Sequence, residues 1–162
     1  MIPAVTSVVD RLASLLDYPT HDFRTHLDAC MREESGLADF ARAMRHLPLG
    51  RLQEIYTETF DLNAACSLDM GWHLFGERHE RGAFLAELRT QLAAAGVEER
   101  GELPDYLPHL LMLMGRMDAA HAGELRRVIE PAIQKLEAAL RDRGSPYGQV
   151  VKTAVAAATR GA

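Results

Sequence analysis

The segment from Tyr56 to Leu85, YTETFDLNAACSLDMGWHLFGERHERGAFL, gathers the side-chain types that most often do chemistry in proteins. It holds one of the two cysteines, two histidines, several carboxylates and the only tryptophan of the chain. Such residues can bind a metal ion, provide a thiol nucleophile or form a surface that holds another protein. The spacing of these residues indicates which of the three functions the segment fits.

A zinc protease needs two histidines four residues apart, with a glutamate directly after the first. His79 and Glu80 provide the first half of that pattern, but Ala83 stands where the second histidine is required. His26 and Cys30 are also four residues apart and would share one face of a helix. Because a structural zinc site has four ligands, this pair favours a buried cysteine beside a half-exposed histidine.

Cys66 and His73 could act as a thiol and its base, but seven residues separate them and nothing in the sequence orients the histidine. The segment GERHERG has two glycines but lacks the Lys-Ser or Lys-Thr that follows a phosphate-binding loop. A metal-dependent or thiol enzyme therefore stays as an alternative, which stoichiometric metal in the purified protein would support.

The length of 162 residues predicts a single domain spanning residues 1–162. A net charge of -5 with scattered basic residues argues against nucleic-acid binding and favours a basic partner. No run approaches the roughly 20 apolar residues of a membrane helix, and the N-terminus lacks the basic start of a signal peptide. We therefore expect a cytoplasmic protein without membrane insertion, with Cys30 and Cys66 as reduced thiols.

Apolar residues recur at helical spacing along most of the chain, and no segment alternates as a strand does. We predict an all-α domain of about eight or nine helices. In the longest helix, Pro131 must kink the axis or begin a new segment. The predicted helices cover Val5 to Leu16, Phe23 to Met31, Leu37 to Leu47, Leu49 to Phe60, Leu68 to Phe75, Phe84 to Leu92, a short one near Asp105, Leu125 to Arg143, and the segment from Pro146.

Two segments look suited to holding a peptide. SLDMGWHLF, residues 67–75, is apolar nearly all round, so it is either wholly buried or has one face in the core and another in a groove. ELPDYLPHLL has two prolines that bracket a rigid acidic turn, which fits an amphipathic peptide with basic residues. The alternative for this turn is a capped helix start in which Asp105 complements the helix dipole.

YTETFDLN, SLDMGWHLFGERHERG and ELPDYLPHLL, in this order and spacing, resemble the NarJ branch of the TorD/DmsD/NarJ chaperones, which assemble molybdenum enzymes. RLASLLDYP and SPYGQVVK also resemble that branch, so the resemblance covers nearly the whole chain. It implies an all-helical, cytoplasmic protein that is not an enzyme. The family binds the N-terminal leader of a catalytic subunit and holds the apo-enzyme while a molybdopterin cofactor is inserted, retaining no cofactor itself.

The family pattern of glutamate, proline, aspartate and histidine falls here on Glu102, Pro104, Asp105 and Tyr106. Tyrosine replaces the histidine, so no protonation role of that histidine carries over. After YTETFD the chain continues as LNAACSL and then GWHLFGE, which leaves the client open between a nitrate reductase and a related respiratory molybdenum oxidoreductase. We expect a monomer or weak homodimer, and a general helical adaptor is the second alternative.

We expect aromatic and apolar anchors in the peptide site, with carboxylates that pair with basic residues of the leader. The predicted client-binding residues are Tyr56, Glu58, Phe60, Asp61, Asp69, Trp72, His73, Phe75, Glu102, Pro104, Asp105, Tyr106 and Leu111.

Overall fold

The computed structural model describes residues 7–162, so Val5 of the first predicted helix lies outside the described residues. Within them the chain forms nine α-helices, one π-helical turn and one 3-10 turn, with no β-strand, which confirms the predicted all-α fold. The helices are α1 (Val8–Ser14), α2 (Phe23–Glu33), α3 (Ala38–Met44), α4 (Leu49–Tyr56), η1 (Thr57–Asp61), η2 (Ala64–Cys66), α5 (Met70–Phe75), α6 (Glu80–Ala95), α7 (Leu107–Gly115), α8 (Ala119–Asp142) and α9 (Tyr147–Thr159).

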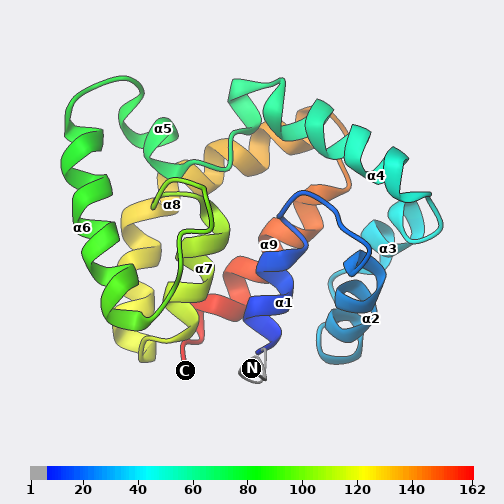
Figure 1. The fold of residues 1–162 in the computed structure, drawn as a ribbon, viewed down its shortest axis with the longest axis horizontal. Coiled ribbons are helices and arrows are strands. Elements are labelled where there is room, and N and C mark those ends of the chain that lie inside the picture. Colours follow the sequence, from blue (N-terminus) through cyan, green and yellow to red (C-terminus); the bar gives the residue numbers. More distant parts are fainter. Residues whose placement is uncertain (1–6) are drawn as a thin grey trace.

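Helix α1 lies at the centre of the fold, where it packs against α2, α7 and α9 (Figure 1). Helices α2 and α3 lie at one end of the molecule and α6 at the other, while α8 contacts both α5 and α9. Buried apolar side chains from all nine α-helices form one continuous cluster.

Two helices end at residue types that favour helix termini. Gly96 ends α6 and Gly144 follows α8, with φ angles of 72° and 63°, which glycine adopts at little cost. Oγ of Ser145 then accepts a hydrogen bond from the amide of Tyr147 at 3.2 Å, just beyond Pro146. These caps set where α6 and α8 turn back on the core.

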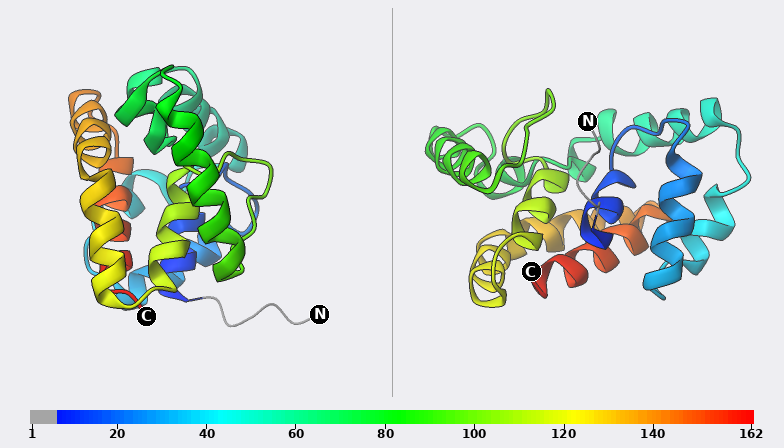
Figure 2. Two further views of the ribbon diagram at one scale, coloured as in Figure 1. Left: turned by 90° about the vertical axis from the view of Figure 1, so that its left-hand side faces the viewer. Right: turned by 60° about the horizontal axis from the view of Figure 1, so that its bottom comes forward.

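Helix α8 differs from its prediction at its start. It begins at Ala119 instead of Leu125, because Asp118 caps it by accepting a hydrogen bond from the amide of His121 at 2.9 Å. The first turns are rich in alanine and glycine, so they show no strong apolar period. Pro131 lies inside the helix without starting a new one, and the ribbon of α8 changes direction along its length (Figure 2).

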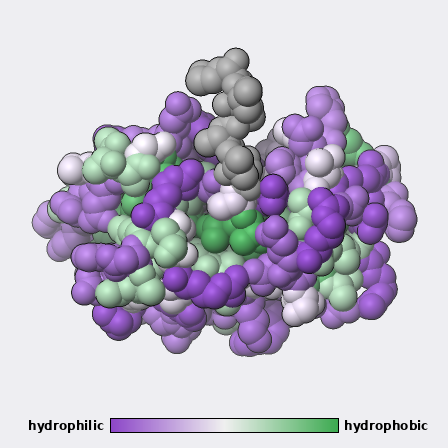
Figure 3. Space-filling view, turned by 90° about the horizontal axis from the view of Figure 1, so that it is seen from below, coloured by the Kyte–Doolittle hydropathy of each residue, from purple (hydrophilic) through white to green (hydrophobic). Residues whose placement is uncertain are grey.

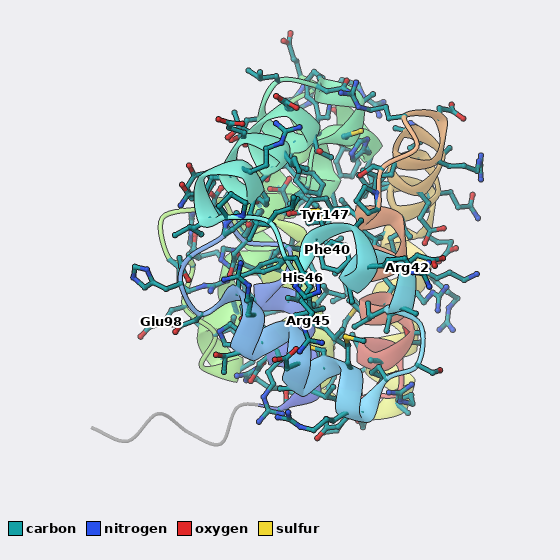
Figure 4. All side chains as sticks on the ribbon, turned by 90° about the vertical axis from the view of Figure 1, so that its right-hand side faces the viewer. Phe40, Arg42, Arg45, His46, Glu98 and Tyr147 are labelled. Atoms are coloured by element: carbon teal, nitrogen blue, oxygen red, sulfur yellow. The ribbon has the colours of Figure 1, made fainter. Side chains whose placement is uncertain are left out.

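An aromatic cluster joins α3 and α9 to the end of α4 and the π-helical turn that follows it. The rings of Phe40 and Tyr147 lie 5.2 Å apart, and Figure 4 shows the two side chains together. Phe60 lies 4.8 Å from Tyr147 and 4.9 Å from Tyr56. The cluster therefore supports the segment that carries Tyr56 and Phe60 from behind.

The molecule seen from below has hydrophilic side chains over most of its face and hydrophobic ones gathered near the centre (Figure 3). At the end where α6 finishes and α8 begins there is a largely apolar hollow of about 540 Å³, which includes Leu113, Met117 and Val128.

Among residues 7–162, no helix is both long enough and apolar enough to cross a membrane.

Candidate functional site

Two of the motifs singled out in the sequence, SLDMGWHLF and ELPDYLPHLL, lie side by side. The amide of Met70 donates to the carbonyl of Asp105 at 2.9 Å, and the amide of Leu107 donates to the carbonyl of Leu68 at 2.7 Å. These bonds form an isolated antiparallel bridge between Asp69 and Tyr106. The start of α5 and the turn before α7 thus form one unit.

Asp105 ties a third element to that unit. Its side chain is fully buried and accepts a hydrogen bond from the amide of Gly71 at 2.9 Å. The guanidinium of Arg81, at the start of α6, donates from Nε to Oδ2 at 3.0 Å and from Nη2 to Oδ1 at 3.3 Å. Such a bidentate pair has restricted geometry, so Asp105 fixes α5, α6 and the start of α7 relative to one another.

A cleft of about 580 Å³ opens beside this unit and is lined by residues from the loop that follows α1, the end of α4 and the loop that joins α6 to α7. Four of its lining residues are carboxylates and one is a basic residue, so we name it the acidic cleft. It is lined by Asp17, Tyr18, Tyr56, Phe60, Asp61, Ser67, Leu68, Asp69, Arg100, Glu102 and Tyr106.

Two tyrosine hydroxyls form the floor of the acidic cleft. The hydroxyl of Tyr56 donates to the carbonyl of Leu16 at 2.8 Å, and that of Tyr106 donates to Oδ1 of Asp17 at 2.9 Å. Burial raises the pKa of both hydroxyls well above the usual tyrosine range, so both stay protonated donors. Tyr106 therefore fixes the position of the Asp17 carboxylate without carrying charge.

The π-helical turn Thr57–Asp61 continues α4 and shapes the rim of the cleft. The amide of Leu62 reaches back five residues to the carbonyl of Thr57 at 3.0 Å. The wider turn places Phe60 and Asp61 in the cleft lining and leaves Leu62 with 75% of its surface exposed. Turns of this kind often occur at functional sites.

Two smaller hollows adjoin the acidic cleft. The first, about 330 Å³, holds the half-buried Trp72 and shares Phe60, Asp61 and Asp69 with the cleft, and we name it the Trp72 hollow. The second, about 400 Å³, includes Glu58 and shares Tyr18 with the cleft. Both hollows include Leu62, so this exposed side chain is shared by the two.

Asp69 is the most strongly perturbed carboxylate that lines the cleft. Burial and the nearby negative charge of Asp105 raise its pKa to about 6, although Arg81 opposes the shift with a guanidinium nitrogen 3.6 Å away. Asp69 therefore titrates just below neutral pH. A cation placed in the cleft would favour its charged form.

The predicted residues separate into two groups. Seven of them border the cleft or its Trp72 hollow, namely Tyr56, Phe60, Asp61, Asp69, Trp72, Glu102 and Tyr106, and Glu58 lies in the adjoining hollow. The other five lie behind or beside these: His73 bonds the carbonyl of Ser67 at 2.7 Å, Phe75 packs on Phe84, and Pro104, Asp105 and Leu111 are buried. Leu111 has no exposed surface, because it faces the core from α7.

Several residues of the site lie outside the set predicted from the sequence, chiefly Asp17, Tyr18, Leu62 and Arg100. Tyr18 is 51% exposed and Leu62 is 75% exposed, and both adjoin motifs already singled out. An exposed large apolar residue beside a motif was the available signal. No signal in the sequence points to Arg100, because its partner Asp17 lies 83 residues earlier in the chain.

The described residues 7–162 contain no group of three or more histidine, cysteine, aspartate or glutamate side chains arranged to hold a metal ion. Cys66 lies in the core and receives a hydrogen bond from Nδ2 of Asn63 at 3.4 Å. Burial raises the pKa of the Cys66 thiol and raises that of Cys30 to about 12. Both thiols are therefore protonated at neutral pH, which makes them poor nucleophiles.

Comparison with known proteins points to one family. Residues 25–152 match the family described as the nitrate reductase delta subunit. The chain is 34% identical over 96 residues to the nitrate reductase molybdenum cofactor assembly chaperone NarJ of Escherichia coli K12, covering 59% of this chain and 41% of that protein.

Two further relatives carry similar names. The probable chaperone NarW of the same strain is 28% identical over 117 residues, covering 72% of this chain and 51% of NarW. The probable chaperone NarJ of Bacillus subtilis 168 is 27% identical over 157 residues, covering 90% of this chain and 85% of that protein. The matched part of the chain thus spans about half or less of the Escherichia coli relatives and most of the Bacillus one.

Proposed function

Because the chain belongs to the nitrate reductase delta subunit family of NarJ-type molybdoenzyme assembly chaperones, we propose that it holds the catalytic subunit of a molybdenum oxidoreductase during assembly. In this proposal the client is a nitrate reductase or a relative of one. The chaperone binds the N-terminal leader of this client in the cytoplasm. The client receives the molybdopterin cofactor while it is held, and the chaperone binds without catalysing a reaction.

The observation that carries this proposal is the acidic cleft with its two adjoining hollows. Four carboxylates line the cleft, and the exposed or half-exposed side chains of Tyr18, Leu62 and Trp72 line the cleft or its two adjoining hollows. Large exposed apolar groups beside charged ones are typical of a surface that binds a partner. This combination fits an amphipathic leader helix, with its apolar face on the aromatic residues and its basic residues near the carboxylates.

Ordering a leader of about 15 residues costs roughly 1 to 2 kcal/mol per residue, so scattered weak contacts could not hold it. A few apolar anchors must dominate, and Trp72, Leu62 and Tyr18 offer the accessible area. The carboxylates contribute mainly to specificity and to the rate of encounter. Micromolar binding, about -8 kcal/mol, would capture a client and still release it when folding around the cofactor removes the bound segment.

The proposal is tested first by capture from the native host with tagged protein. We expect mass spectrometry to identify a molybdopterin-dependent catalytic subunit, and we expect its capture to fail when the leader of that subunit is deleted. Recovery of unrelated proteins alone would contradict the proposal and support a general helical adaptor.

The cleft itself is tested by calorimetric titration with a synthetic peptide of the first 15 residues of that subunit. Asp61→Lys reverses an exposed charge of the cleft, and we expect it to weaken binding about tenfold, or about 1.4 kcal/mol. Asp39→Lys reverses an exposed charge on α3, outside the cleft, and is the matched control. Equal affinities of the two variants would exclude the acidic cleft as the leader site.

A further inference from the structure

The loop that joins α6 to α7 crosses the edge of the acidic cleft. Both of its ends are anchored: Val97 is buried, with its amide bonded to the carbonyl of Leu92 at 2.9 Å, and the carbonyl of Leu103 bonds Nδ1 of His109 at 2.9 Å. Between these anchors, the side chains of Arg100 and Glu102 line the cleft. We name residues 97–103 the strap.

Arg100 reaches across the cleft to the loop that follows α1. Its Nη1 donates to Oδ2 of Asp17 at 3.0 Å and its Nη2 approaches Oδ1 at 3.4 Å. Arg100 is also the one non-glycine residue among residues 7–162 with a positive φ, 53°. A side-chain-bearing residue adopts this conformation at a cost, so the strap contains local strain while Arg100 is paired with Asp17.

The two partners of this ion pair are not equally fixed. The hydroxyl of Tyr106 holds Asp17 in place from below at 2.9 Å, independently of Arg100. The Arg100 side chain is 41% exposed and its backbone is strained, and exposed ion pairs of this kind are weak. If Arg100 left, Asp17 would remain as a positioned carboxylate without its cation.

We propose that the strap holds Arg100 on Asp17 across the acidic cleft in the absence of client, and that a basic side chain of the client displaces the strap by replacing Arg100 on Asp17. The incoming guanidinium or ammonium group takes over the pair with Asp17, while Arg100 moves to solvent and its backbone relaxes. The inference rests on the proposed function for the source of the basic side chain. It deepens that function by making Arg100 an internal competitor of the client.

The cation probe is N-acetyl-L-arginine amide, and N-acetyl-L-citrulline amide is its neutral counterpart of nearly the same shape. Each is titrated into isotope-labelled protein while the amide signals of residues 17, 18 and 97–103 are followed by nuclear magnetic resonance. We expect the arginine amide to bind Arg100→Gln about two- to fivefold more tightly than the unaltered protein, the range typical of an exposed ion pair. We expect the citrulline amide to leave these signals unchanged.

Arg116→Gln is the matched control for Arg100→Gln. Arg116 forms a comparable pair with Asp10 at 3.0 Å and 38% exposure, but it joins α7 to α1 outside the cleft. We expect this variant to bind the probe as the unaltered protein does. Equal or weaker binding by Arg100→Gln, or equal binding of the two amides, would overturn the proposal.

Hydrogen exchange provides a readout that does not depend on affinity. We expect the arginine amide to accelerate exchange of the strap amides in the unaltered protein, and we expect Arg100→Gln to show fast exchange without it. If the strap amides of Arg100→Gln exchange at the same rate as those of the unaltered protein, the proposed role of the strap is overturned. A third outcome separates the two proposals. If the leader peptide binds none of the variants while the arginine amide behaves as expected, the proposed function is contradicted and only the displacement of Arg100 from Asp17 is supported.

Discussion

The backbone amide of Gly71 donates a hydrogen bond to Oδ2 of Asp105, 34 residues later in the chain, across 2.9 Å. A Cβ atom on Gly71 would collide with that same oxygen and would lie 3.2 Å from Nε of Arg81. The glycine is therefore required for close approach of α5 to the turn before α7. This contact explains why GWHLF and LPDY act as one unit although they are distant in sequence.

Replacing Gly71 with alanine tests this contact. We expect Gly71→Ala to lower the free energy of unfolding by about 1 to 3 kcal/mol, because the new methyl group overpacks a site whose neighbours are a buried ion pair. Urea denaturation followed by circular dichroism measures the change. Gly82→Ala is the control, since the Cβ there meets open space inside α6 and we expect a gain of about 0.5 to 1 kcal/mol. Equal effects of the two variants would contradict the close-approach account.

Removing the Asp105 carboxylate should destabilise the fold severely. Asp105→Ala leaves Arg81, whose side chain is 20% exposed, without its main partner, and breaking a buried pair costs about 3 to 5 kcal/mol. The measurement is again urea denaturation. Glu54→Ala breaks the exposed pair with Arg51 at 3.0 Å and should change stability by less than about 1 kcal/mol. A loss of similar size in both variants would show that Asp105 has no special structural role.

The sequence supports the helices and the motifs better than it supports the side-chain roles within the motifs. Asp105 was predicted to pair with basic leader residues, but its partner in the structure is Arg81, which no local pattern relates to it. Leu111 was predicted as an anchor, but α7 is apolar nearly all round, so the sequence alone does not distinguish the face of α7 that meets the core. Asp17 and Arg100 meet through the tertiary fold alone.

The stability of the protein should depend on the titration of Asp69. Its pKa is raised in the folded state to about 6 from the model-compound value of 3.8, mainly by burial and then by Asp105. The folded state thus holds this proton more tightly than the unfolded state does. Its contribution to stability is full below about pH 4 and is lost as pH rises towards about 6.

Asp69→Asn should therefore be more stable than the unaltered protein above pH 6, by about 1 to 3 kcal/mol, and the difference should shrink as pH falls to 4. Urea denaturation at pH 4, 5, 6 and 7.5 measures the difference, and the carboxyl carbon signal of Asp69 reports the pKa directly. A stability difference that is constant with pH would show that the pKa of Asp69 is not raised by folding.

Trp72 should be an anchor for the leader peptide. It is half-buried in the Trp72 hollow beside Phe60 and Asp61, so its accessible face can be covered by a ligand without disturbing the core. Because aromatic anchors contribute large contact area at low entropic cost, we expect Trp72→Ala to weaken binding tenfold or more, at least about 1.4 kcal/mol, with helicity retained. Calorimetric titration of the 15-residue leader peptide measures affinity, and circular dichroism measures helicity.

Val128→Ala is the control for Trp72→Ala. It truncates an apolar residue that is 53% exposed on α8, and it should leave the affinity unchanged. Unchanged affinity of a folded Trp72→Ala protein would remove Trp72 from the binding site and direct attention to Tyr18 and Leu62 as the remaining accessible anchors.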